Sequence, residues 1–230
     1  SKRAKYKNKE NPAVELIRKV IANKDNNRME RYDYVSYRKY ERMQFSLSNL
    51  SDKFKSRKVF KNYQFLFQKQ DSTKIGSKTL LPVFQQEKLS DNYFRKNPEK
   101  TKTIVMADKQ VNFDERFIDN KGLSTYFDRM YQEIDIYDNN ISVVSNQLLS
   151  PIAGSAPTFY KFFITDTLKT ERLIELSFIP RNKTDLLFEG RIYVTMDGNY
   201  AVQSVYLTVN KDINLNFVRA LEAKLDFTQN

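Results

Sequence analysis

The chain has 230 residues, of which 40% are hydrophobic and 29% charged, so it is neither a disordered segment nor a bundle of membrane helices. It contains no His, no Cys and no Trp, which excludes disulfides, Ser-His-Asp and Cys-His catalysis, ordinary zinc sites and cysteine-ligated iron–sulfur clusters. The net charge of +11 favours anionic partners, but the basic residues are spread along the chain, which is typical of solubilising surface charge.

The N-terminal part of the chain predicts one helix after a short basic terminus. Residues 1–10 are polar and basic, lack the apolar stretch of a signal peptide and are expected to be flexible. Asn11 and Pro12 are a favourable N-cap and first residue for a helix. Apolar residues then recur at helical spacing as far as Ala22, and the Asn-rich stretch 23–27 ends the pattern.

Strands are predicted next. Apolar and polar residues alternate over 31–47, and further strands are predicted over 78–89 and 102–111, with 91–100 as their connection. Pro82 cannot donate to a ladder, so its strand is expected to lie at a sheet edge or to contain a bulge there.

The second half of the chain is predicted to contain one more helix followed by strands only. Residues 120–134 have helical spacing, 138–147 are ambiguous, and 150–157 form a loop that is the best candidate for a weak domain boundary within a single domain of residues 1–230. Asp197-Gly198, between two alternating runs, predicts a β-hairpin. The strands are expected over 158–167, 172–179, 186–196, 199–210 and 214–227.

Without His and Cys, carboxylates are the main remaining route to catalysis. Glycoside hydrolysis needs two carboxylates about 5–9 Å apart across a cleft. Asp135 with Asp138, and Asp114 with Glu115, are close in sequence, but neither pair lies in a catalytic motif. The stretch around Asp135 does not match a calcium-binding loop, and the isolated glycines form no phosphate-binding loop. We therefore predict no catalytic, cofactor-binding or metal-binding residues and no cofactor, with a carboxylate enzyme acting on a glycan as the alternative.

Basic residues mixed with aromatics suggest two kinds of binding. The segments 37–40, 93–96 and 159–163 have the composition of a module that binds nucleic acid or another anionic polymer. Alternation places their rings in a sheet face, where core packing is the usual role, so a nucleic-acid partner is not expected. If the sheet curves around a helix, rows of aromatic side chains could instead line a concave face for an acyl chain or a peptide.

Several blocks of the sequence resemble a family of unknown function among large Gram-negative outer-membrane proteins. The blocks are Asn11–Ile17, Asn23–Asp25, Leu81–Phe84, Leu89–Asp91, Arg95–Pro98, Ser150–Ala153, Thr165–Thr167, Phe178–Arg181, Phe188–Gly190 and Asn216–Val218. The resemblance implies a signal peptide and a carboxypeptidase-regulatory-like β-sandwich before this region and a probable membrane β-barrel after it. It supplies no catalytic residues.

The resemblance and the element pattern together give the expected fold, place and role. The fold class is α+β: a curved, mainly antiparallel sheet with an N-terminal helix and a second helix near 120–134, similar to the half-barrel lipoprotein carriers of the periplasm by fold-level analogy. The resemblance implies a segment on the periplasmic side of the outer membrane, cut from a larger protein. The expected role is non-enzymatic binding or assembly, with a hydrophobic ligand, a membrane protein or the rest of its own chain as partner.

Overall fold

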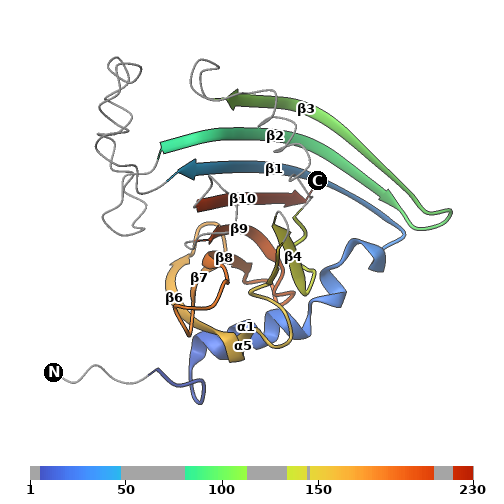
Figure 1. Ribbon diagram of the computed structural model, residues 1–230. Coiled ribbons are helices and arrows are strands. Elements are labelled where there is room, and N and C mark those ends of the chain that lie inside the picture. Colours follow the sequence, from blue (N-terminus) through green and yellow to red (C-terminus); the bar gives the residue numbers. More distant parts are fainter. Residues whose placement is uncertain (1–5, 48–80, 113–133, 144–145, 210–219, 230) are drawn as a thin grey trace, which may run out of the picture.

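A long antiparallel sheet forms most of the fold in the computed structural model, and helices and a small hairpin lie against one of its faces (Figure 1). The structure describes residues 6–47, 81–112, 134–143, 146–209 and 220–229. The helices are α1 (Pro12–Ala22) and α5 (Ala156–Phe159), with 3-10 turns η1 (Asp25–Asn27) and η2 (Met29–Arg31). The strands are β1 (Tyr34–Leu47), β2 (Leu81–Arg95), β3 (Lys100–Asn112), β4 (Asn140–Val143), β5 (Asn146–Leu149), β6 (Tyr160–Leu168), β7 (Leu173–Pro180), β8 (Glu189–Thr195), β9 (Val202–Val209) and β10 (Ala220–Gln229).

The main sheet has eight strands in the order β3-β2-β1-β10-β9-β8-β7-β6, and every pairing is antiparallel. Most strands that are neighbours in the sheet are also consecutive in the chain. The exception is the pair of β1 and β10, the first and last described strands. The α+β class is therefore confirmed. The sheet is open and not strongly curled, so the half-barrel analogy extends only to an antiparallel sheet with a helix against one face.

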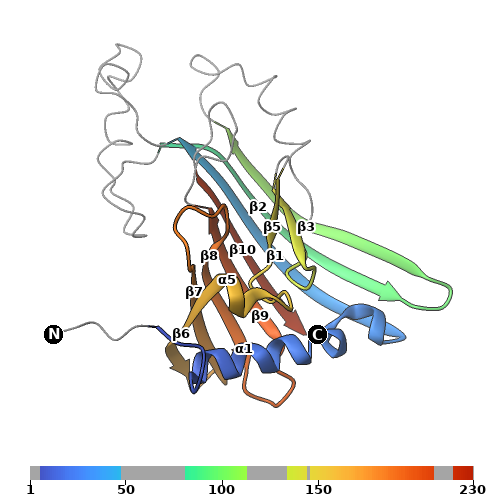
Figure 2. The same cartoon turned by 60° about the horizontal axis from the view of Figure 1, so that its bottom comes forward.

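Helix α1 forms where the sequence predicts it. The Asn11 side chain accepts a hydrogen bond from the Ala13 amide at 3.0 Å, Pro12 takes the first turn, and Asn23 closes the other end. Val14, Ile17 and neighbouring apolar residues of one face are buried. Burying such side chains contributes roughly 1.5–3 kcal/mol each, so α1 is held mainly by its packing. Figure 2 shows α1 lying across the strands of the sheet.

The apolar half of the core lies on β6–β9. Leu176, Ile192 and Val205 stand opposite one another across three neighbouring strands, and all three are fully buried. Opposite residues in an antiparallel pair share a face, so this row packs with α1 and the β4–β5 hairpin in one cluster.

The same face becomes polar where it continues onto β1 and β2. Lys39 and Glu41 are only 3% and 8% exposed, and their Nζ and Oε1 atoms lie 3.1 Å apart. Ser90 is opposite Lys39, and the buried Asn92 side chain donates to the Ser90 hydroxyl at 3.0 Å. Buried charges must be paired because an isolated charge loses its hydration.

Several boundaries differ from the predicted ones. β2 continues to Arg95, so the first part of the predicted connection 91–100 is strand. β2 lies between β1 and β3, and the register shifts next to Pro82, which confirms a bulge and not an edge. The ambiguous stretch 138–147 contributes the β4–β5 hairpin. The predicted helix near 120–134 lies outside the described residues except for its last position.

The loop 150–157 and the hairpin at Asp197 can both be compared with their predictions. Ser150, Ile152 and Ala156 of the loop are fully buried, and the last two belong to the main core cluster. The division of the chain into domains stays a prediction. The hairpin is confirmed: it joins β8 to β9, and the Asp197 carboxylate accepts a hydrogen bond from the Asn199 amide at 2.9 Å.

Candidate functional site

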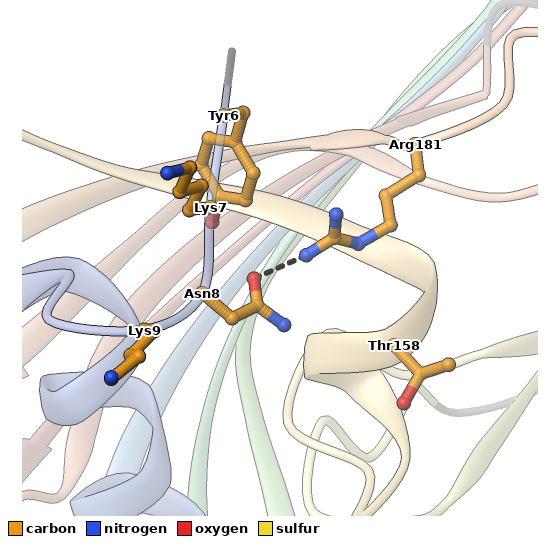
Figure 3. A pocket seen from close by; sticks show the side chains of 6 residues that line it. All are labelled: Tyr6, Lys7, Asn8, Lys9, Thr158 and Arg181. Carbon is orange, nitrogen blue, oxygen red and sulfur yellow. Dashed lines mark hydrogen bonds between the residues drawn. The ribbon is translucent and has the colours of Figure 1, made fainter.

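A basic recess of about 510 Å³ lies where the segment before α1 crosses the ends of β6 and β7. It is open to solvent. Figure 3 shows the side chains that line it: Tyr6, Lys7, Asn8, Lys9, Thr158 and Arg181.

Arg181 ties the three segments of the recess together. Its backbone amide, just after β7, donates to the Phe159 carbonyl at 2.8 Å. Its guanidinium Nη2 donates to the Asn8 side-chain oxygen and, at 3.2 Å, to the Pro157 carbonyl. The Asn8 amide group donates to the same Pro157 carbonyl at 2.9 Å. The position of the guanidinium is thereby fixed on two sides.

Tyr6 covers the edge strand β6 beside the recess. Its hydroxyl donates to the Phe162 carbonyl at 3.3 Å and accepts from the Phe162 amide at 2.8 Å. The Arg181 guanidinium lies 5.0 Å from the centre of the Tyr6 ring, within the range of a cation–π contact. One side chain thus satisfies both backbone groups of an edge residue that would otherwise offer a pairing site to another strand.

The recess is positively charged and keeps donors unused. Lys7, Lys9 and Arg181 line it, and no acidic residue does. The Nε atom of Arg181 is buried without a hydrogen-bond partner among the described residues. A buried hydrogen-bond donor without an acceptor costs about 1–3 kcal/mol of folding free energy. An N–H group left without an acceptor beside a surface recess therefore needs an explanation, such as a bound ligand or an ordered water. The chemistry available here is anion binding, because the lining side chains offer cations and hydrogen-bond donors and include no carboxylate.

The sequence does not predict this site. Its composition predicts a basic flexible terminus over residues 1–10, whereas the structure places Tyr6 and Asn8 against β6 and Arg181. The presence of Tyr6 and Asn8 within a lysine-rich run was the only available signal, and it did not identify their contacts.

The carboxylates Asp135 and Asp138, weighed as a catalytic pair, are both held by Arg28. Its guanidinium lies 3.9 Å from Asp135 Oδ2 and 3.2 Å from Asp138 Oδ1. Asp135 also accepts the Tyr137 amide at 2.8 Å. Burial raises the pKa of Asp135, but its oxygens cap the backbone and bind a cation, as in a structural turn. Asp114 and Glu115 lie outside the described residues.

The other described polar clusters give no sign of a metal site. Across the described ranges, no group of three or more acidic, His or Cys side chains could hold a metal ion. Within the same ranges, no helix has the length and apolar character needed to cross a membrane.

The segments rich in basic and aromatic residues divide between the two faces of the sheet. Arg38 is exposed and binds Asp91 through two hydrogen bonds of 2.7 and 2.9 Å, whereas its neighbour Lys39 is buried. Phe94 is buried and Tyr93 is exposed. Neither segment presents a single face of stacked rings and cations.

Most aromatic residues of β6 and β7 fill the core, whereas Phe163 of β6 is 41% exposed. Tyr160, Phe162 and Phe178 are fully buried, and the rings of Tyr160 and Phe178 meet edge to face at 5.4 Å. The Tyr160 hydroxyl donates to the Leu149 carbonyl at 2.6 Å. These three rings form packed core and do not line an open concave face, whereas Phe163 and the preceding Phe159 are exposed.

Comparison with known proteins gives one family. The family described as "Family of unknown function (DUF5686)" matches residues 16–230. No curated protein matches the chain.

Proposed function

The chain belongs to this family of unknown function, and from that premise we propose that it is a non-catalytic assembly module on the periplasmic side of an outer-membrane protein. In this proposal it binds a strand of a membrane-protein partner, or of the remainder of its own protein, along β3. The resemblance to outer-membrane proteins motivates the location, and the exposure of β3 motivates the mode of binding.

The exposure of β3 is the observation on which the proposal depends. Every described side chain from Thr101 to Gln110 is exposed, and among the described strands β3 pairs only with β2. Its centre is apolar: Ile104, Val105 and Met106 are 38%, 51% and 56% exposed. An extended edge with an apolar centre is the surface used in β-strand addition, where backbone hydrogen bonds give affinity and alternate side chains give specificity.

The charges of β3 indicate what kind of strand fits it. Lys100, Lys102 and Lys109 flank the apolar centre, with Asp108 as the one acidic residue among the described positions of β3. The register shift between Leu89 and Ser90 marks a bulge on this side of the sheet. Edge lysines and bulges oppose indiscriminate pairing, so we expect the partner strand to be apolar in its centre and acidic at its ends.

The paired carboxylates support the non-catalytic part of the proposal. Asp135 and Asp138 bind Arg28, and the buried Glu41 binds Lys39. Catalysis by two carboxylates needs side chains that converge on a cleft with separated pKa values, and these pairs serve turns and the core instead.

Thiol labelling tests the proposed role of β3, because the chain has no Cys and a single introduced thiol is unique. Met106→Cys is placed on β3, and Met196→Cys, in the β8–β9 turn and 43% exposed, is the matched control. Each variant is labelled with a maleimide as the isolated 230-residue chain and as the full-length protein in outer-membrane vesicles.

We expect Cys at position 106 to react in the isolated chain and to be protected in the membranes, while the control reacts in both. Equal reactivity at position 106 in the two preparations would contradict strand addition at β3. Failure of the full-length protein to fractionate with outer membranes would contradict the proposed location.

A further inference from the structure

We propose that the recess formed by Tyr6, Lys7, Asn8, Lys9, Thr158 and Arg181 is a binding site for a phosphate group, carried either by a lipid headgroup or by a soluble phosphate. This site is separate from the β3 edge and does not depend on the function proposed above.

The charge of the recess selects an anion. Two lysines and one arginine line it without an acidic neighbour among the lining residues. Glu10 is adjacent, but its contact with Lys9 spans 3.8 Å between two side chains that are 84% and 88% exposed. An exposed pair of this kind is weak and leaves Lys9 able to reach a ligand.

The arrangement of Arg181 favours a phosphate over a simple halide. Asn8 and the Pro157 carbonyl occupy its Nη2, and the Tyr6 ring lies against the guanidinium plane, so the side chain is held before any ligand arrives. Its Nε is buried without a hydrogen-bond partner among the described residues. A planar donor group that is held in place matches the several acceptor oxygens of a phosphate.

The other cationic and hydroxyl side chains of the recess lie on two sides of the Tyr6–Lys9 segment. Figure 3 shows Thr158 below Arg181 and the lysines on the opposite side of the Tyr6–Lys9 backbone. Thr158 lines the recess and is exposed, so its hydroxyl can donate to an oxygen there. A phosphate beside Arg181 would therefore contact the guanidinium and the Thr158 hydroxyl, and the exposed Lys7 and Lys9 side chains would reach it by turning across the Tyr6–Lys9 backbone.

The test measures the binding of inorganic phosphate to the chain by isothermal titration calorimetry at low ionic strength. The key variant is Lys7→Gln/Lys9→Gln, because both side chains are exposed and their loss should leave the fold intact. The control is Lys96→Gln/Lys169→Gln, which removes the same charge from exposed positions elsewhere. We expect the key variant to weaken phosphate binding by about tenfold or more and the control to change it less than about twofold.

A third variant, Arg181→Lys, keeps the charge and removes the planar donor group. We expect it to weaken binding while its circular dichroism spectrum remains that of the parent chain. If its fold is disturbed, the lysine pair and its control decide the result by themselves.

Vesicles separate the two sources of the phosphate. Phosphatidylcholine vesicles with and without phosphatidic acid are mixed with the chain and sedimented. Binding to phosphatidic acid that depends on Lys7 and Lys9 supports a lipid headgroup, whereas binding of inorganic phosphate alone supports a soluble ligand. The proposal is overturned if neither probe binds, or if the control variant loses as much binding as the Lys7/Lys9 variant.

Discussion

Gly190 occupies a position on β8 where no side chain fits. It is opposite Leu207 on β9 and Phe178 on β7, so strands flank it on both sides. A Cβ atom built there would lie 1.9 Å from the Tyr206 carbonyl oxygen and 2.9 Å from its carbonyl carbon. Carbon atoms in favourable contact are about 3.5–4 Å apart, so Gly190→Ala requires the β9 backbone to move.

The size of the effect follows from what must move. Overpacking a well-packed core costs about 1–3 kcal/mol, and displacing the Tyr206 backbone also disturbs ladder hydrogen bonds worth about 1 kcal/mol each. We therefore expect Gly190→Ala to reduce the free energy of unfolding by about 3 kcal/mol or more. In a chain of this length that corresponds to a fall in Tm of about 6–12 °C.

Gly154→Ala is the matched control, because nothing lies within 4 Å of the Cβ it would add. Unfolding in urea is followed by circular dichroism, since the chain has no Trp to report by fluorescence. We expect the control to stay within about 0.5 kcal/mol of the parent chain. Equal stabilities of the two variants would show that β8 and β9 do not approach each other as closely as described.

Three further variants test the core, a buried carboxyl group and the hairpin. Tyr160→Phe removes the donor to the Leu149 carbonyl and should cost about 1–3 kcal/mol of unfolding free energy in urea, while an unchanged midpoint would contradict that bond. Burial raises the pKa of Glu189, so the folded state holds that proton to higher pH and its contribution to stability falls as pH rises from the ordinary pKa through the raised one. Glu189→Gln should remove this loss of stability. The free energy of unfolding is measured between about pH 4 and about pH 7, and a variant whose stability falls with pH as steeply as that of the parent chain would refute the prediction. Hydrogen bonds, first of all from the Asn199 amide, lower the pKa of Asp197, so its contribution is present above the ordinary pKa and lost as pH falls through the lowered one. Asp197→Ala should therefore destabilise the chain by about 1 kcal/mol near neutral pH and by less in acid. A loss of stability that does not change with pH would show that the ionised form of Asp197 is not what stabilises the hairpin.

Local features were predictable because they depend on neighbours in the sequence. Asn11 and Pro12 start α1 for reasons of capping and backbone geometry, and Asp197-Gly198 turns the chain between two alternating runs. Pro82 predicted an irregularity, and the bulge is present, although its strand is internal.

The candidate site was not predictable, because its residues come from distant parts of the chain. Asn8 and Arg181 are 173 positions apart, and Tyr6 and Phe162 are 156 apart. Each is unremarkable in its own segment. The recess exists only because α1 packs on the core, which brings the preceding residues across the ends of β6 and β7.

The sequence by itself determined the α+β class, α1, the run of antiparallel strands and the absence of His and Cys chemistry. These follow from periodicity, capping and composition, which act over a few residues. Tertiary structure alone decided that β1 pairs with β10, that Lys39 and Glu41 are buried as a pair, and that β3 lies at one edge of the sheet formed by the described strands. Strand order and burial depend on which distant segments meet, and local propensity does not encode that choice.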